Sequence, residues 1–480
     1  MTHPPSGGSQ TSRAPDPKPV PAAAPAPAPA PASAGAPVPT AVPARPRAAW
    51  AVQAERLRAA ATTEPGRLRI IGAVLALLVV AFGAVTTLEI SQRAAAADDV
   101  VGRSQPLSAD AADVYRYLAD ADTTAASGFL AGAQEPRDVQ ARYREDIEGA
   151  ARLLVEAAAG TDADSAAGHE IATLNELLPV YTGLIERARA NNRQGLPLGG
   201  AYLRYANQKM AGEMLPAAER LYAVETGRLE ADSADARRWP FLSIGAGIVV
   251  LGALVWMQRR TYRRTNRVLN HGLLAATAAA SMVVLWLAVG HTVARTELRS
   301  AMEHGQASLD VLNDARISSL KARANENLTL VARGAVLTAD GSADQYETDY
   351  AAGMTTLKDR LEKAGRLADD ANGRNPVAEA VEGASQWQAR HREARATDDR
   401  GDYDGALSRV IGAEESTGQS FEQVDTALQA ALAHEQVEFT SAARDGRGAL
   451  RGLPNGAAVL AVLGAAAVIV GVNRRLSEYR

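Results

Sequence analysis

Four long apolar runs most constrain what this 480-residue chain can fold into. They cover residues 71–88, 240–257, 273–291 and 456–472, and none contains Asp, Glu, Lys or Arg. Because about 20 apolar residues in a helix cross the hydrocarbon core of a bilayer, the sequence predicts membrane spans at 70–90, 239–257, 273–292 and 454–472. A cleaved signal peptide is the alternative for the first run, but about seventy residues precede it, which favours an uncleaved anchor.

Basic residues indicate how these spans are inserted. Arginines precede the first span, follow the last one and crowd the short segment 258–272. Short arginine-rich segments stay on the cytoplasmic side of a membrane, so we expect the N-terminus, a basic loop at 258–272 and the C-terminal residues 473–480 to be cytoplasmic. The loop is a topology signal, and its side chains are also candidates for contact with a cytoplasmic partner or with anionic lipid. These side chains are Arg259, Arg260, Arg263, Arg264 and Arg267.

Residues 1–69 form a tail rich in proline and alanine that holds most of the chain's 23 prolines. Proline removes backbone donors and opposes helix formation, and the tail has few large apolar side chains. We therefore predict a disordered cytoplasmic tail. Its role is open between a passive tether and a docking arm for a cytoplasmic partner.

The two long polar segments, 91–238 and 293–453, are predicted to be helical and to lie outside the cell. Apolar residues recur at steps of three and four, as on one face of a helix. Breaks at 134–136, 160–164 and 191–197 divide the first segment into four helices, a number typical of an antiparallel bundle. The two stripes are Tyr143, Ile147, Ala150, Leu154 and Ala157, and then Tyr350, Met354, Leu357, Leu361, Ala364 and Ala368.

Corresponding landmarks in the two segments are separated by a near-constant offset of about 206 residues, which indicates a tandem duplication. Tyr350 follows Tyr143 at this distance, and Gly401 follows Gly195, where each glycine is expected to open a long fourth helix. The predicted fold class is therefore all-α, with four membrane helices and two extracytoplasmic four-helix bundles. In the second span, Gly245, Gly247 and Gly252 are interpreted as small residues that allow close helix packing, as are two alanine pairs in the third, Ala275 with Ala279 and Ala276 with Ala280.

No pattern in the chain indicates catalysis. The chain has no cysteine, and its seven histidines are scattered without metal-ligand spacing. It also lacks the motifs of metalloproteases, P-loop nucleotide-binding proteins and α/β-hydrolases. We predict that the protein is not an enzyme and has no catalytic residues, cofactor or metal. A net charge of −4 does not point to nucleic acid, and spans without charged residues argue against a transporter or channel.

The stretch 201–222, AYLRYANQKMAGEMLPAAERLY, resembles the actinobacterial GlnX-type membrane proteins, and the arrangement of spans and bundles is similar to theirs from about residue 70 to 475. Each outer bundle also resembles the sensory domain of bacterial chemoreceptors. The resemblance implies a relay of aspartate or glutamate availability, with an extracytoplasmic solute-binding lipoprotein outside and a soluble serine/threonine kinase, protein kinase G, inside. The second bundle has SFEQVDTALQ in place of LPAAERLY, so whether both halves bind alike stays open.

The sequence thus predicts a non-enzymatic, four-span signal-relay protein of the cell membrane. Two alternatives stay open, namely a scaffold for envelope complexes and a receptor that binds its ligand directly. No ligand-binding residue is assigned at this stage, and a homodimer is a further assembly that the sequence allows.

Overall fold

The computed structural model describes residues 64–265, 270–412 and 414–476. All of them belong to the compact unit Ala60–Arg480. In these ranges the regular structure is helical, apart from one isolated β-bridge between Leu337 and Asp344. The predicted all-α fold is confirmed.

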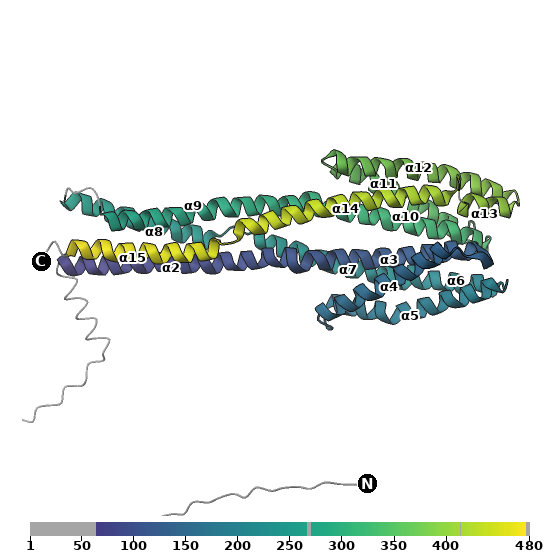
Figure 1. The fold of residues 1–480 in the computed structure, drawn as a ribbon, viewed down its shortest axis with the longest axis horizontal. Coiled ribbons are helices and arrows are strands. Elements are labelled where there is room, and N and C mark those ends of the chain that lie inside the picture. The colour runs from purple at the N-terminus through teal and green to yellow at the C-terminus, as the bar shows by residue number, and fades with distance from the viewer. Residues whose placement is uncertain (1–63, 266–269, 413, 477–480) are drawn as a thin grey trace, which may run out of the picture. The chain divides into compact units, whose positions relative to one another are not determined.

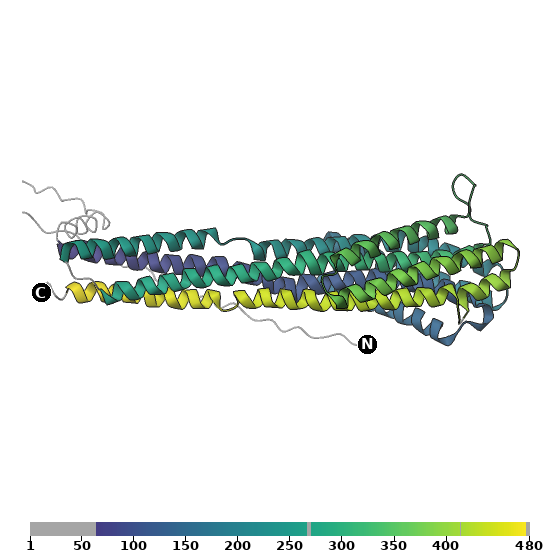
Figure 2. The ribbon, with the colours of Figure 1, turned by 90° about the horizontal axis from the view of Figure 1, so that it is seen from above.

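Among the described residues, four helices are long and apolar enough to cross a membrane, as predicted. Their apolar windows lie in α2 (Glu64–Asp99), α8 (Phe241–Thr265), α9 (His271–Ser300) and α15 (Leu453–Leu476). Helix α2 packs against α8 and α15, and α9 packs against the same two helices (Figures 1 and 2). The four spans therefore form a closed ring of neighbours.

The tail predicted at 1–69 lies outside the described residues up to residue 63. From Glu64 onward the chain is already helical and forms the first turns of α2. Pro65 permits this early start, because the first N–H groups of a helix have no intrahelical partner and proline lacks only such a group.

The segment between the first two membrane-length helices, which we call the first outer segment because it extends beyond their ends, follows the predicted division into four helices. It contains α3 (Gln105–Leu130), α4 (Arg137–Gly160), α5 (Ala166–Arg193) and the pair α6 (Leu198–Lys209) and α7 (Leu215–Arg237), with a short 3₁₀ turn η2 (Gly132–Gln134) after α3. The helices end at the predicted breaks. At the second break, the Ser165 hydroxyl accepts a hydrogen bond from the Gly168 N–H and caps α5, which satisfies one of the free donors at a helix start.

The second outer segment repeats this order, but its fourth helix is broken. It contains α10 (Ala307–Ala332), α11 (Gln345–Leu367), α12 (Ala371–Asp399), α13 (Tyr403–Ile411) and α14 (Thr417–Leu450). α6 and α7 are joined by the helical turn η3 (Met210–Met214), whereas a non-helical stretch separates the corresponding α13 and α14. The loop between α10 and α11 stands away from the helices in Figure 2.

The prediction that Gly401 opens a long fourth helix is wrong. Gly195 and Gly401 do occupy matching turns, with φ of 68° and 85°, a left-handed conformation that glycine adopts without steric cost. After Gly401, however, only the short α13 follows. Glu415 then takes a positive φ of 51°, and the Ser416 hydroxyl caps a new helix by accepting from the Gln419 N–H. The long helix α14 therefore begins at Thr417.

Two π-helical turns link spans to outer helices at corresponding places in the two halves. η1 (Val100–Ser104) joins α2 to α3, and η4 (Ala301–Gln306) joins α9 to α10. A third, η3 (Met210–Met214), joins α6 to α7. The helical backbone continues through η1 and η4, so that α2 with α3 and α9 with α10 each form one continuous helical rod. Such wide turns frequently lie at functional places in helices.

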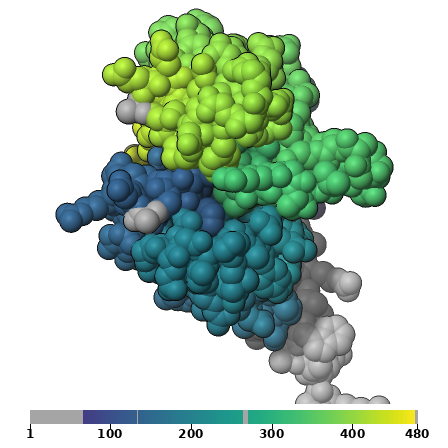
Figure 3. Space-filling view, turned by 90° about the vertical axis from the view of Figure 1, so that its right-hand side faces the viewer, coloured from purple at the N-terminus to yellow at the C-terminus, as the bar shows by residue number. Residues whose placement is uncertain are grey.

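The two outer segments share one hydrophobic core, in which α3 lies against α10. Leu118 of α3 and Leu320 of α10 are both fully buried in it. Polar groups add to the contact, since Thr123 Oγ1 donates to the Leu320 carbonyl at 2.9 Å and Asn327 Nδ2 donates to Ser127 Oγ at 2.7 Å. Figure 3 shows the halves meeting at one end of the molecule, the first blue to teal and the second green to yellow.

The two predicted apolar stripes face this core. On α4, Tyr143, Ala150 and Leu154 are buried, and Ile147 and Ala157 are partly buried against them. On α11, the whole stripe from Tyr350 to Ala364 is buried. The three- and four-residue spacing thus identified the correct helix faces.

Close contacts between spans occur at some of the predicted small residues. A Cβ added at Gly247 would lie 2.6 Å from Val284, whereas Gly245 and Gly252 have nothing within 4 Å at that position. The interpretation is therefore right for Gly247 and wrong for the other two, because only Gly247 is on the face toward α9. Of the two alanine pairs predicted for close packing in α9, Ala276 and Ala280 are both buried, whereas Ala275 is exposed and Ala279 is partly buried.

Candidate functional site

The basic segment 258–272 is not a loop over most of its length. Helix α8 continues to Thr265 and α9 begins at His271. Arginine is a good helix former, and the segment contains no proline or glycine before Gly272, so the helix extends beyond the apolar run. Gln258 Nε2 ties the two helices together by donating to Thr277 Oγ1 at 2.8 Å and to the Leu273 carbonyl at 3.2 Å.

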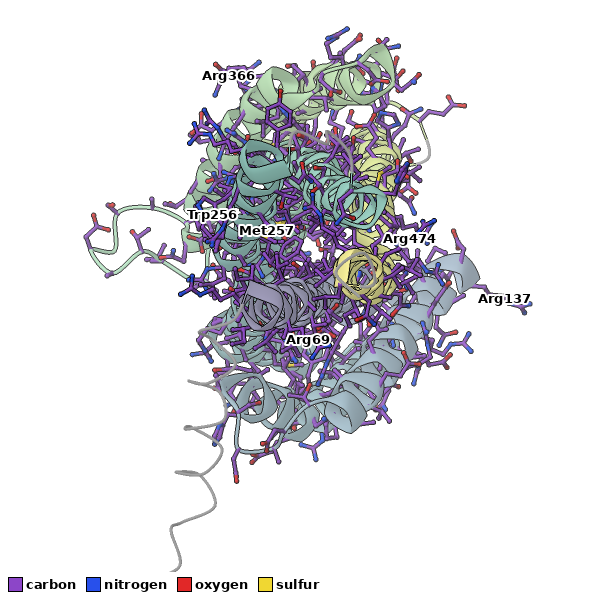
Figure 4. The ribbon with its side chains drawn as sticks, turned by 90° about the vertical axis from the view of Figure 1, so that its left-hand side faces the viewer. Arg69, Arg137, Trp256, Met257, Arg366 and Arg474 are labelled. Atoms are coloured by element: carbon purple, nitrogen blue, oxygen red, sulfur yellow. The ribbon has the colours of Figure 1, made fainter. Side chains whose placement is uncertain are left out.

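The predicted arginines are therefore arranged mainly on the end of a helix. Arg259 and Arg263 are exposed, and the Arg260 guanidinium lies 5.3 Å from the ring centre of Trp256. Arg264 belongs to α8, but its side chain is outside the described part of the structure, and Arg267 is outside the described residues altogether. Figure 4 views this end of the spans and labels the exposed Trp256 next to the buried Met257.

Charged side chains that the sequence analysis did not single out meet where the two outer segments come together. Arg142 of α4 donates through Nη2 to Asp120 Oδ2 of α3 at 3.0 Å. The same guanidinium reaches α14 of the other half, at 3.4 Å from Asp425 Oδ2 and 3.5 Å from Glu422 Oε1. Asp425 is in turn paired with Arg316 of α10 at 2.7 Å. Arg142 thus connects α3, α4 and α14.

These residues border a cleft of about 670 Å³ between the two halves, which we call the interbundle cleft. One wall comes from α3, α4 and the turn between them, and the other from α10, α13 and the start of α14. The volume is within the range of small-molecule sites in proteins. Its lining consists of Asp120, Thr123, Thr124, Ser127, Ala131, Pro136, Asp138, Val139, Arg142, Arg323, Ile411, Gly412, Gly418, Gln419, Phe421 and Glu422.

Both signs of charge are available in this cleft. Asp120 and Arg323 are buried, Arg142 is one-third exposed, and the carboxyl groups of Asp138 and Glu422 are exposed. A guanidinium recognises carboxylate geometry, and carboxylates recognise an ammonium group. The cleft is therefore chemically suited to a small polar solute that carries one or both of these groups.

Arg323 connects the cleft to a buried polar cluster in the second half. Its Nη1 donates to Glu326 Oε2 at 2.5 Å and to Thr417 Oγ1 at 2.8 Å, and its Nη2 donates to the Val410 carbonyl at 3.0 Å. These bonds hold the α13–α14 junction, which is the part of the second half that forms a cleft wall. A change at the cleft can thereby reach the interior of the second half.

Glu326 is the centre of this cluster and is buried to 1% exposure. Besides the Arg323 guanidinium, it accepts a hydrogen bond from Trp387 Nε1 at 3.0 Å and pairs with His391 Nδ1 at 2.8 Å. His391 Nε2 lies 3.1 Å from Glu347 Oε1, and the ring of Tyr350 stacks on the imidazole. Burial alone would raise the pKa of Glu326, but Arg323 and His391 hold it below its ordinary value.

A pH dependence of stability follows from His391. Burial alone would lower its pKa, but the hydrogen bonds and charges of Glu326 and Glu347 raise it from 6.5 to about 9. Because the folded-state pKa is above the unfolded one, this stabilisation is fully present below pH 6.5 and is lost as the pH rises through about 9. We expect the melting temperature of the detergent-solubilised protein to fall over this interval, measured by intrinsic fluorescence.

The variant His391→Gln should show a smaller fall in melting temperature over the same pH interval. His169→Gln is the matched control, because His169 is an exposed histidine on α5, and its pH profile should be that of the wild type. An unchanged slope in His391→Gln would contradict the assignment.

No signal within one helix distinguishes these charged residues from solvated ones. Asp120 lies in the alanine-rich stretch ADADTTAAS and Arg142 between exposed charges of α4. Their partners are far away in the chain, since Asp425 follows Arg142 at a separation of 283 positions. Only the contact of the two halves brings them together.

Comparison with known proteins gives one match, which lies in the first half of the chain. Neither the curated proteins nor the solved structures contain a match to this chain. Residues 96–234 match the family model described as an actinobacterial sensor domain. These residues include α3 to α6 and most of α7, which form the first outer segment and one wall of the interbundle cleft. The match supports an actinobacterial sensor protein whose helices are long and apolar enough to cross a membrane.

Proposed function

We propose that this protein is a multi-pass membrane sensor that passes the availability of extracellular amino acids, aspartate or glutamate, to a cytoplasmic serine/threonine kinase. The observation that carries the proposal is the interbundle cleft, which is walled by both outer segments and adjoins the α3–α10 contact. Occupancy of the cleft, or docking of a protein beside it, changes the relative position of the two outer segments and so favours one of their packing arrangements.

The route of the signal follows continuous helices. α3 leads through η1 into α2, and α10 leads through η4 into α9. A shift between α3 and α10 therefore becomes a shift between spans, since packed helices have discrete alternative arrangements. In the proposed orientation the basic segment with Arg259, Arg260 and Arg263 faces the cytoplasm, where its exposed guanidinium groups are available to the kinase.

The amino-acid ligand and the two partners rest on the resemblance to GlnX-type proteins. The cleft supports the ligand class, because an acidic amino acid offers carboxylates for Arg142 and an ammonium group for Asp120, Asp138 or Glu422. A solute-binding lipoprotein that delivers the signal would dock on the same outer segments. The proposed localisation is the cell membrane, with both termini inside and both outer segments outside.

The orientation can be tested directly because the natural chain has no cysteine. Single cysteines replacing the exposed residues Glu145 of α4 and Arg263 of α8 give two reporters. In intact cells, a membrane-impermeant maleimide should label the first position and not the second until the cells are opened. Labelling of the second position in intact cells would overturn the proposed topology.

The relay itself is tested by deletion and complementation. Loss of the protein should abolish the dependence of kinase-substrate phosphorylation on external aspartate and glutamate, and the wild-type gene should restore it. Affinity purification from a gentle detergent extract should recover the kinase or a solute-binding lipoprotein. If phosphorylation still follows amino-acid supply in the deletion strain while envelope complexes are disturbed, the protein is a scaffold instead.

The cleft is tested with side chains that are exposed, so that folding is preserved. The double variant Asp138→Ala/Glu422→Ala removes two carboxylates from its lining. We expect that half-maximal phosphorylation then needs at least about a tenfold higher aspartate concentration, because a loss of about 1.4 kcal/mol in ligand contacts lowers the affinity tenfold. Glu145→Ala changes an exposed carboxylate of α4 outside the cleft and should respond as the wild type does. Equal responses of the two variants would remove the cleft from the mechanism.

Direct binding is a second candidate, favoured by the size of the cleft. If the protein itself is the receptor, aspartate or glutamate should raise the melting temperature of the purified full-length protein, because a ligand that binds only the folded state stabilises it. The Asp138→Ala/Glu422→Ala variant should lose this shift. If the wild type shows no shift while the cellular response persists, the signal arrives through a binding protein.

A further inference from the structure

Three potential metal ligands that do not line the interbundle cleft converge on one point. His434 Nε2 of α14 lies 3.1 Å from Asp370 Oδ1, at the start of α12, and 3.4 Å from Glu438 Oε1, one turn further along α14. All three ligand atoms lie within 4.8 Å of one another. Their side chains are 23%, 39% and 40% exposed, so the cluster is open to solvent on one side.

These separations suit a metal ion better than a hydrogen bond alone. One ring nitrogen faces two carboxylate oxygens at once, and a single N–H shared between two acceptors is less well directed at either than a simple hydrogen bond. In a tetrahedral site with metal–ligand bonds of about 2.0–2.1 Å, neighbouring ligand atoms are about 3.3–3.4 Å apart. The two separations at His434 Nε2, 3.1 and 3.4 Å, are close to this edge length.

The orientation of Asp370 is fixed independently of any metal. Its Oδ1 accepts a hydrogen bond from the Gly373 N–H at 2.7 Å and caps α12, and its Oδ2 accepts from Asn372 Nδ2 at 3.1 Å. Hydrogen bonds of this kind orient metal-binding carboxylates and are part of their sites.

A further carboxyl group belongs to the surroundings of the cluster. Glu435 follows His434 in the chain and is buried at 5% exposure. A divalent cation held by Asp370, His434 and Glu438 would offset the repulsion between the carboxylates of this region.

We propose that Asp370, His434 and Glu438 bind a zinc ion, with water in the fourth position. One imidazole and two carboxylates are ligands that Zn²⁺ accepts in tetrahedral geometry, whereas Ca²⁺ and Mg²⁺ prefer oxygen ligands alone and more of them. The ion ties the turn between α11 and α12 to α14, the helix that leads directly to α15. This site is independent of the amino-acid ligand proposed above.

The test uses the purified full-length protein in detergent, with zinc chloride as the probe. Titration calorimetry should detect the binding of one zinc ion by the wild type, and zinc should raise the melting temperature of the wild type. His434→Gln should weaken zinc binding by more than about tenfold. Loss of a residue that only orients a metal ligand already lowers metal affinity by about tenfold or more, and His434 is proposed to be a ligand itself. Magnesium and calcium chloride at the same concentration should give no comparable shift.

Two further variants separate metal binding from helix capping. Asp370→Asn retains a side-chain oxygen that can cap α12, and Glu438→Gln alters a half-exposed side chain, so both should fold and both should bind zinc more weakly. His169→Gln, which alters an exposed histidine on α5, should bind zinc as the wild type does. Equal zinc affinity in His434→Gln and His169→Gln, an absence of zinc binding by the wild type, or an equal shift with calcium would overturn the proposal.

Discussion

Replacing Glu326 by alanine is expected to be among the most destabilising single changes in the described part of the chain, at about 3–5 kcal/mol. The side chain is fully buried and accepts from Arg323 and Trp387 while pairing with His391. Its removal leaves a guanidinium and an imidazolium in the interior without their shared counter-charge. Breaking a buried ion pair on one side carries this large cost because the remaining charge is desolvated and uncompensated.

Thermal unfolding followed by tryptophan fluorescence is a suitable measurement, since the fully buried Trp387 is in the same cluster. The matched control is Glu379→Ala, which removes an exposed carboxylate from α12 and should change stability by no more than about 0.5 kcal/mol. If the two variants melt at the same temperature, Glu326 does not have the role that its contacts indicate.

Replacing Gly83 by alanine is expected to disturb the contact between the first and fourth spans. A Cβ at this position would lie only 2.1 Å from the Cβ of Ala461 on α15. Ala461 has no longer side chain that could rotate away, so the two helices themselves must separate. Overpacking of this kind typically costs about 1–3 kcal/mol, and in lipid it also removes the close van der Waals contact on which helix association depends.

A compensating change distinguishes this clash from other effects. The double variant Gly83→Ala/Ala461→Gly restores the space and should recover much of the lost melting temperature, as expected for directly coupled positions. Gly252→Ala is the control, because nothing lies within 4 Å of a Cβ there. Should Gly83→Ala melt as Gly252→Ala does, the close packing of α2 on α15 would be refuted.

A small residue in a span does not by itself indicate a close helix contact. Gly245, Gly247 and Gly252 have the same appearance in the sequence, yet only Gly247 lies against another helix. The rotation of α8 about its axis decides which glycine faces a neighbour. This rotation depends on packing with α2 and α9, and no residue of α8 specifies it alone.

The metal cluster is a similar case. The spacing of His434 and Glu438 places them one turn apart on a helix, an arrangement that is also common on solvated faces, and the sequence predicts no metal site. Asp370 is 64 residues away from His434 in the chain. Asp370 joins His434 and Glu438 only because α12 packs against α14 in the folded protein.

The sequence by itself determined the helices, the four membrane-length segments, the predicted breaks of the first outer segment and the buried faces of α4 and α11. These features follow from local propensity, from apolar periodicity and from the thickness of a bilayer, all of which act over a few turns of helix. The tertiary structure alone decided the α3–α10 contact, the interbundle cleft and the pairing of Arg142 with Asp425 and of Glu326 with His391. A charged residue on a helix has the same local pattern whether it meets water or a partner, so its environment is decided only when distant helices pack.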